Sequence, residues 1–147
     1  LIRTGLVIDQ GGGLLERMLL PFKLALGGRI GEGKQWMSWI HRQDWLNIIQ
    51  AMIETPAMHG SCNATAPNPV NNLEFTRSLG RFLNRPTCLP LPAWLLKLIL
   101  GEMSALLLGS QRVIPEKLLQ QGFKFQYPTL NEAFTKIFSP SNSNQTD

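Results

Sequence analysis

The sequence predicts an α/β fold followed by a smaller, mostly helical lobe. In the first half of the chain, short strand-like runs alternate with segments of helical periodicity, whereas the second half is mostly helical. The 147 residues are 44% apolar and 16% charged, which is enough apolar material for the core of one ordinary domain. We expect the α/β part to span residues 1–90, the helical lobe residues 91–138, and a disordered tail residues 139–147.

Three segments have the character of short strands. Residues 1–8 are apolar on both faces, which is typical of a strand covered on both sides in a parallel sheet. Residues 36–41 and 62–65 are the other two. Alternation along 36–41 places Trp39 and His41 on one face and Ile40 on the other. We therefore expect Ile40 in the core and the two rings on the side of a cleft.

The helices are predicted from apolar spacing and from the residues at their ends. Asp44 is a suitable N-cap for the second helix, and either Asn71 or Asn72 for the third. Pro21 interrupts the first helix, and Gly122 ends the fifth. The expected helices cover residues 14–26, 44–53, 72–83, 92–108, 115–121 and 130–138.

Composition argues against several classes of partner. The net charge of +4 comes from scattered Lys and Arg residues, so we expect no nucleic acid as a partner. Cys62 and Cys88 lack partners at metal-ligand spacing, so we expect no metal site. We expect two buried thiols, with a single disulfide as the alternative. No secretory leader is visible, and the apolar stretch 94–108 is too short to cross a bilayer. We expect a cytoplasmic protein with no membrane partner.

No complete catalytic centre is visible in the sequence. Gly11 to Gly13 follow a strand and precede a helix, but their spacing is not that of a dinucleotide-binding turn. His41 has Asp44 nearby but no nucleophile in a recognisable turn. Tyr127 is followed four residues later by Asn131, not by the Lys of a Tyr-x-x-x-Lys pair. We therefore predict no catalytic residue in this chain.

Tryptophan is concentrated in one short stretch, at Trp36, Trp39 and Trp45. Two interpretations remain open. The indole rings line a cleft for a flat or sugar-like ligand, or they pack in the core.

Several runs of residues together form a recognisable pattern. The most specific are the Pro-Phe-Lys-Leu sequence at 21–24 and the Ser-Trp-Ile-His sequence at 38–41. Weaker ones are Arg-Thr-Gly-Leu-Val-Ile at 3–8, Gly-Glu-Gly-Lys-Gln at 31–35, Asn-Ala-Thr-Ala-Pro-Asn-Pro-Val at 63–70 and Gln-Arg-Val at 111–113. With these runs the chain, up to about Phe138, resembles the epimerase-like branch of the extended short-chain dehydrogenase/reductases, the NAD-dependent epimerase/dehydratase family.

The resemblance implies the C-terminal portion of a Rossmann-type extended short-chain dehydrogenase plus a small, mostly helical substrate-side lobe. The full-length parent would be an oxidoreductase that uses NADP or NAD. Its glycine fingerprint and its Tyr-x-x-x-Lys would lie before Leu1, so this chain alone is expected to bind no cofactor and to be inactive. The parent's partners would be a small-molecule substrate and either the missing N-terminal half or a homo-oligomer.

The same resemblance implies site residues. Arg3, Thr4 and Gly5 would lie on the cofactor side, whereas Gln35, Trp39 and His41 would face the substrate. Extended members often hold a nucleotide-sugar diphosphate with an arginine at the position that Met37 occupies here. A thioether cannot pair with a diphosphate, which argues against a nucleotide-sugar substrate. The competing interpretation is a non-enzymatic binding or structural remnant module.

Overall fold

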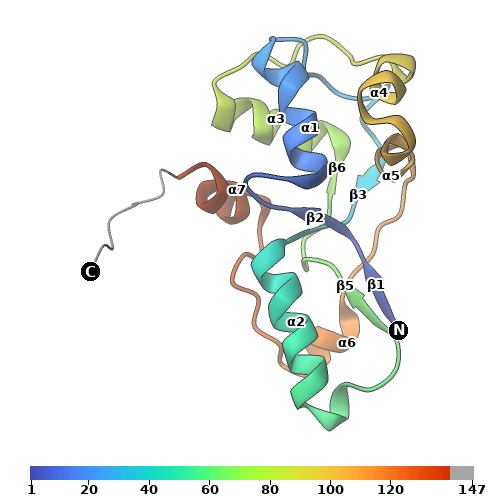
Figure 1. Cartoon of the computed structure of the whole chain (residues 1–147), viewed down its shortest axis with the longest axis vertical. Helices are drawn as coiled ribbons and strands as arrows, with labels where there is room; N and C mark the ends of the chain where they lie inside the picture. Colours follow the sequence, from blue (N-terminus) through green and yellow to red (C-terminus); the bar gives the residue numbers. More distant parts are fainter. Residues whose placement is uncertain (140–147) are drawn as a thin grey trace.

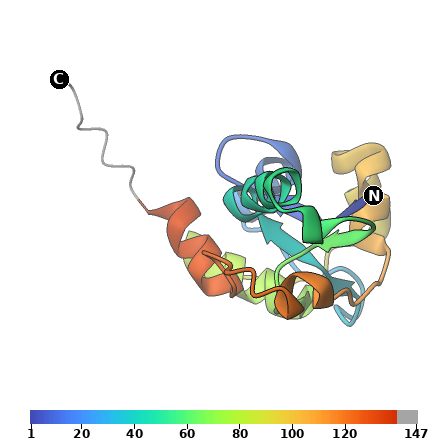
Figure 2. The ribbon, with the colours of Figure 1, turned by 90° about the horizontal axis from the view of Figure 1, so that it is seen from below.

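The computed structural model describes residues 1–139, and it confirms the α/β architecture. Short strands run through the middle of the molecule, with helices packed on both sides (Figure 1). The predicted tail lies outside the described residues, except for Ser139. Viewed from below, α7 (Leu130–Phe138) lies at one end of the molecule, and α4 (Ala93–Leu100) and α5 (Ser104–Leu108) lie at the other (Figure 2).

The first strand is interrupted at Gly5, where it changes its partner. Residues Ile2–Thr4 form β1, which pairs in parallel with β5 (Cys62–Ala64). Residues Leu6–Ile8 form β2, which pairs in parallel with β4 (Trp39–His41). The parallel pairing was predicted, but burial on both faces was not fully realised. Arg3 and Thr4 are exposed because the ends of β1 and β5 border a pocket.

Gly5 is required because two strands and a loop meet there. A Cβ atom at this position would lie 2.4 Å from the carbonyl oxygen of Ser38 and 2.8 Å from Cγ2 of Thr65. The Gly5 amide donates to Ala64 O, and the next amide, that of Leu6, donates to Ser38 O at 2.8 Å. The absence of a side chain therefore lets the strand pass from one partner to the other.

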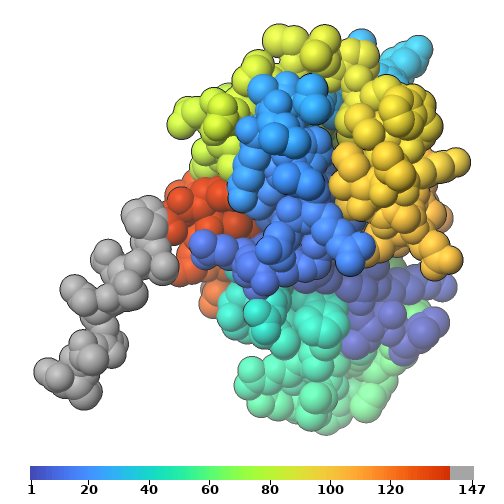
Figure 3. Space-filling view, turned by 45° about the horizontal axis from the view of Figure 1, so that its top comes forward, coloured from blue at the N-terminus to red at the C-terminus, as the bar shows by residue number. Residues whose placement is uncertain are grey.

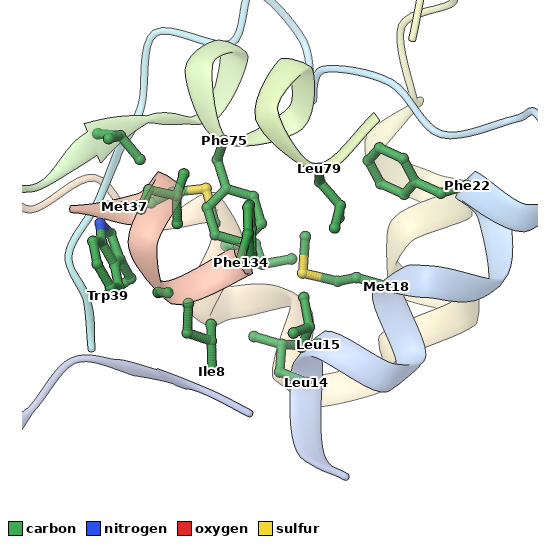
Figure 4. Close-up of a cluster of buried hydrophobic side chains, with 14 of the residues drawn as sticks. Ile8, Leu14, Leu15, Met18, Phe22, Met37, Trp39, Phe75, Leu79 and Phe134 are labelled. Carbon is green, nitrogen blue, oxygen red and sulfur yellow. The ribbon is translucent and has the colours of Figure 1, made fainter. Parts of the chain in front are cut away.

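Two apolar clusters lie on opposite faces of the strands. The larger one contains Ile8 and Trp39 together with residues of α1, α3, α4, α5 and α7 (Figure 4). The smaller one contains Ile40 and Ala64 together with residues of α2 and α6. Successive residues of β4 thus point into different clusters, as strand alternation requires. The helix bounds are α1 Gly13–Lys23, α2 Arg42–Glu54, α3 Asn72–Leu83 and α6 Glu116–Gln120.

The remaining elements are short. The helix expected at 92–108 is broken at Gly101, whose φ is 59°. It divides into α4 (Ala93–Leu100), a 3₁₀ turn (Gly101–Met103) and α5 (Ser104–Leu108), which pack beside α1 (Figure 3). A second 3₁₀ turn covers Pro56–Met58, and β3 (Trp36–Met37) pairs antiparallel with β6 (Val70–Asn71).

Asp44 does not cap α2, contrary to the prediction. The cap is His41, whose Nδ1 accepts the Gln43 amide at 3.1 Å, and α2 begins two residues before Asp44. The fully buried Asp44 carboxylate accepts the amides of Gln126 at 2.8 Å and Tyr127 at 2.9 Å. A long-range pair of hydrogen bonds therefore takes the place of the expected local one. Asn71 caps α3, which settles the alternative left open by the sequence.

Other predictions divide in the same way. The sequence also predicts that Leu96, Ile99 and Leu107 of the helix at 92–108 are buried. Leu96 and Leu107 are buried as predicted, whereas Ile99 is half-buried. Cys62 is a buried thiol, but Cys88 is exposed because it lies in the loop between α3 and α4, which contradicts the expectation of two buried thiols. Within residues 1–139, no helix has the length and apolar character needed to cross a bilayer.

Candidate functional site

The principal pocket lies where β1 and β5 end. Its volume is about 520 Å³. Arg3 and Thr4 lie at the carboxyl end of β1, and Asn63 and Thr65 lie at that of β5. The pocket therefore borders the position at which the first strand stops pairing with β5, as β1, and begins to pair with β4, as β2. In open α/β sheets, ligands bind outside the carboxyl ends of strands at such points of divergence. The pocket is lined by Arg3, Thr4, Gly5, Leu6, Trp36, Met37, Ser38, Asn63, Thr65, Ala105, Leu106, Gly109, Ser110, Gln111 and Val113.

One wall of the pocket is the segment 109–115, which connects α5 to α6. The Ser38 hydroxyl donates to Gln111 O at 2.7 Å and accepts the Val113 amide at 2.9 Å. The Trp36 amide donates to Ser110 Oγ at 3.1 Å. The Ser38 side chain therefore satisfies two backbone groups of the segment, the Ser110 side chain satisfies the Trp36 amide, and together these bonds fix the segment over the pocket.

The residues on β5 add two longer contacts to the same wall. Thr65 Oγ1 donates to Val113 O and Asn63 Nδ2 donates to Ile114 O, each at 3.5 Å. Both side chains thus line the pocket and hold its wall at the same time.

A second, more polar hollow of about 430 Å³ adjoins the first. It shares Arg3, Asn63 and Val113 with the principal pocket, and it adds Ser61, Arg112, Ile114, Glu116 and Lys117. The Arg112 guanidinium lies over the Trp36 ring, 5.1 Å from the ring centroid, in the geometry of a cation–π contact. The Lys117 ammonium donates to His59 O.

The predicted cofactor-side residues all line the principal pocket. The exposed side chain of Arg3 borders both hollows. The Thr4 hydroxyl accepts the indole N–H of Trp45 at 3.2 Å, which connects β1 to α2. Gly5 contributes only backbone atoms, because a Cβ at this position would collide with Ser38.

The predicted substrate-side residues are not in the pocket. Trp39 is 0% exposed and His41 is 5% exposed, so the expectation that both rings line a cleft is wrong. Ile40 is buried as predicted. The physical reason is that β4 is covered on both faces, so alternation separates two apolar clusters instead of core from cleft. The indole N–H of Trp39 donates to Asn68 O at 3.1 Å, which supports the core-packing interpretation of this tryptophan.

Gln35 and His41 have structural partners as well. Gln35 Nε2 donates to Ile30 O at 3.2 Å, and Gln35 O accepts the Asn72 amide at 2.8 Å. The ring of His41 lies against Tyr127, with the ring centroids 4.1 Å apart. Burial lowers the pKa of His41 below its ordinary value, although the carboxylates of Asp9 and Asp44 act in the opposite direction. The substrate-binding role of Gln35, Trp39 and His41 stays a prediction.

Sequence reasoning missed the polar residues that build the pocket wall. Asn63 and Thr65 occupy alternate positions of a predicted strand, and a polar pair at that spacing on an otherwise apolar strand was the available signal. Ser38 and Arg112 gave no such signal, because their partners are more than 70 residues away in the sequence. Within the part of the chain that the structure describes, no group of His, Cys, Asp and Glu has an arrangement suited to a metal ion.

Comparisons with known proteins show what this chain is similar to. Residues 91–137 match a family model described as a domain of unknown function, DUF1731. The chain is 39% identical over 137 residues to the epimerase family protein YfhF of Bacillus subtilis, covering 93% of this chain and 45% of that protein. It is also 39% identical to the human epimerase family protein SDR39U1, covering 92% of this chain and 47% of that protein.

Solved structures give the same result. The crystal structure of human epimerase family protein SDR39U1 (isoform 2) with NADPH superposes with a TM-score of 0.85 at 37% identity, over 95% of this chain and 48% of that one. The dTDP-glucose 4,6-dehydratase of Bacillus anthracis shares the fold alone, with a TM-score of 0.65 at 15% identity, over 93% of this chain and 42% of that one.

The fold matches the C-terminal portion of Rossmann-type extended short-chain dehydrogenase structures, as predicted. More specifically, the chain matches the C-terminal part of the epimerase family proteins, and the resemblance seen in the sequence is confirmed. The chain spans about half the length of the curated relatives it matches. The division into segments 1–90 and 91–138 stays a prediction.

Proposed function

We propose that this chain forms the substrate-binding side of an NAD(P)-dependent epimerase-like oxidoreductase. In this proposal Arg3, Thr4 and Gly5 border the nicotinamide end of the cofactor. The observation that carries it is the position of the pocket at the carboxyl ends of two parallel strands, where one strand changes its partner. The human relative, which was crystallised with NADPH, supports the same assignment.

The residues present fit one end of such a cofactor and not all of it. Strand ends and the exposed Arg3 offer polar backbone and a cation beside the pocket. The glycine turn at 11–13 lacks the spacing of a dinucleotide fingerprint, so the pyrophosphate has no evident turn among these residues. When bound, the nicotinamide would supply hydride transfer. The chain by itself is then expected to be inactive and to bind neither NAD nor NADP in the micromolar range, which calorimetric titration tests.

The sheet offers a place for a partner strand. Among residues 1–139, β1 and β2 each pair along one edge only. An unpaired edge presents a row of free backbone N–H and C=O groups, which favours the addition of another strand. We propose that the N-terminal half of the parent protein, or failing that a second copy of the chain, pairs there.

A hybrid protein tests the proposal. In it, this chain replaces the matching stretch of the human relative, and NADPH binding is followed by fluorescence titration. We expect the hybrid to bind NADPH, and Arg3→Gln to weaken binding by about fivefold or more through loss of a charged group at the cofactor. Arg77→Gln removes the same charge from α3, away from both hollows, and is the matched control.

A folded hybrid that fails to bind NADPH would contradict the proposal. It would favour the alternative, a binding or structural module without enzymatic function. Location belongs to the proposal too. We infer a cytoplasmic protein, although the Arabidopsis thaliana relative is named as chloroplastic.

A further inference from the structure

The two hollows adjoin each other, and we call them together the groove. Arg3, Asn63 and Val113 line both of them, and their volumes are about 520 and 430 Å³. A ligand that extends past these three residues would contact both hollows. Each hollow is large enough for part of a small organic molecule.

The two ends of the groove differ in chemistry. The principal pocket contains an apolar wall, made of Leu6 and Met37 from the strand region and Ala105 and Leu106 from α5. Leu106 is 67% exposed, which leaves its side chain available to an apolar ligand. Burying apolar surface here would contribute to binding in proportion to the area removed from water.

The second hollow is basic. Arg3, Arg112 and Lys117 face a single carboxylate, Glu116, so the cations exceed the anions by two. Within residues 1–139, the ion pairs involve neither of the two arginines, and no hydrogen bond occupies their guanidinium groups. Stacking on Trp36 restrains Arg112 while leaving the N–H groups at the guanidinium edge free to donate. Planar donors of this kind suit a carboxylate or a phosphate.

We propose that the groove binds an amphipathic anion, whose apolar chain or ring lies in the principal pocket and whose carboxylate or phosphate lies at Arg112 and Lys117. This deepens the proposed function, because the anion would be the substrate of that site. The basic hollow sets the charge of the substrate, and the apolar wall sets the length of its uncharged part.

Calorimetric titration of the purified chain with three eight-carbon probes tests the inference without cofactor or turnover. The probes are octanoate, octyl phosphate and the neutral octanamide, in a buffer free of phosphate. We expect at least one anion to bind about tenfold more tightly than octanamide. Preference for octanoate identifies a carboxylate as the natural head group, and preference for octyl phosphate identifies a phosphate. Either preference supports the inference.

Charge and apolar contact are separated by matched variants. Arg112→Gln and Lys117→Gln should each weaken binding of the anion by about threefold or more and leave octanamide unchanged, whereas Arg77→Gln should change neither. Leu106→Asn should weaken all three probes. Leu98→Asn, on the exposed face of α4 and outside the groove, should weaken none. Circular dichroism confirms that each variant is folded.

Three results would overturn the inference. They are octanamide binding as tightly as both anions, no binding by any probe, and inorganic phosphate or acetate binding as tightly as its octyl counterpart. Because NADPH is absent from these titrations, their failure is distinct from a hybrid that fails to bind NADPH.

Discussion

The substitution Gly5→Ala tests the crossing point of the strands. The added Cβ would lie 2.4 Å from Ser38 O and 2.8 Å from Thr65 Cγ2, whereas real Cβ atoms essentially never approach within 3.0 Å. Both neighbours are held, since Ser38 O accepts the Leu6 amide and the Thr65 hydroxyl donates to Val113 O. The strand must therefore move by several tenths of an ångström, and overpacking of this kind costs about 1–3 kcal/mol.

The effect on the unfolded chain is smaller and opposite in sign. Replacing glycine by alanine stabilises a protein by about 0.4–1 kcal/mol where the backbone permits it, because the unfolded chain loses freedom. Gly5 does not have a positive φ, so this gain applies and lowers the net loss to about 0.5–2 kcal/mol. Urea denaturation of the two proteins measures the difference.

The matched control is Gly12→Ala. A Cβ at Gly12 meets nothing within 4 Å, and its φ of 171° is extended backbone that alanine adopts. We expect a change within about 0.5 kcal/mol, since Gly12 is an N-cap position at which alanine is slightly less favourable. Equal stability of the Gly5→Ala protein and the wild type would refute the packing argument for the strand crossing.

Three further predictions concern buried residues. Asp44→Asn leaves one backbone amide without an acceptor and should lower the free energy of unfolding by about 1–3 kcal/mol, measured by urea denaturation. Asn47→Ala on the same helix should lower it far less. Equal losses would contradict the role of the carboxylate. Leu107→Ala, fully buried, should cost about 2–5 kcal/mol, and Leu106→Ala, mostly exposed, under about 1, so similar melting temperatures would refute the burial argument. Because burial lowers the pKa of folded His41, its neutral form is favoured, so its contribution to stability is present above about pH 6.5 and is lost as the pH falls toward the folded pKa. His41→Gln should flatten the fall in unfolding free energy as the pH decreases below about 6.5, and an unchanged slope would count against this role of His41.

Local signals predicted most of the elements. The apolar spacing of α1 and α7 and the capping Asn71 are visible in the sequence because they depend on residues within one or two turns. The break at Gly101 could also have been predicted from the sequence, since glycine is the residue that most readily adopts a positive φ.

The errors arose where distant segments decide the outcome. Asp44 has the residue type of an N-cap, but its carboxylate accepts amides 82 and 83 residues away. Trp39 was predicted beside a cleft because strand alternation was taken to separate a buried face from an exposed one. Both faces of β4 are in fact covered by apolar clusters. The pocket wall could not be predicted from the sequence either, because Ser38 and the segment 109–115 come into contact only in the folded chain.

The burial of β4 on both faces has a consequence for unfolding. Trp39 of this strand belongs to the larger cluster and Ile40 to the smaller one, so neither cluster is complete without the strand. A local opening of α2 and α6 would expose Ile40 to water and remove the support on which Trp39 rests. The two halves of the core should therefore lose protection against amide hydrogen exchange together, in a single cooperative event instead of two.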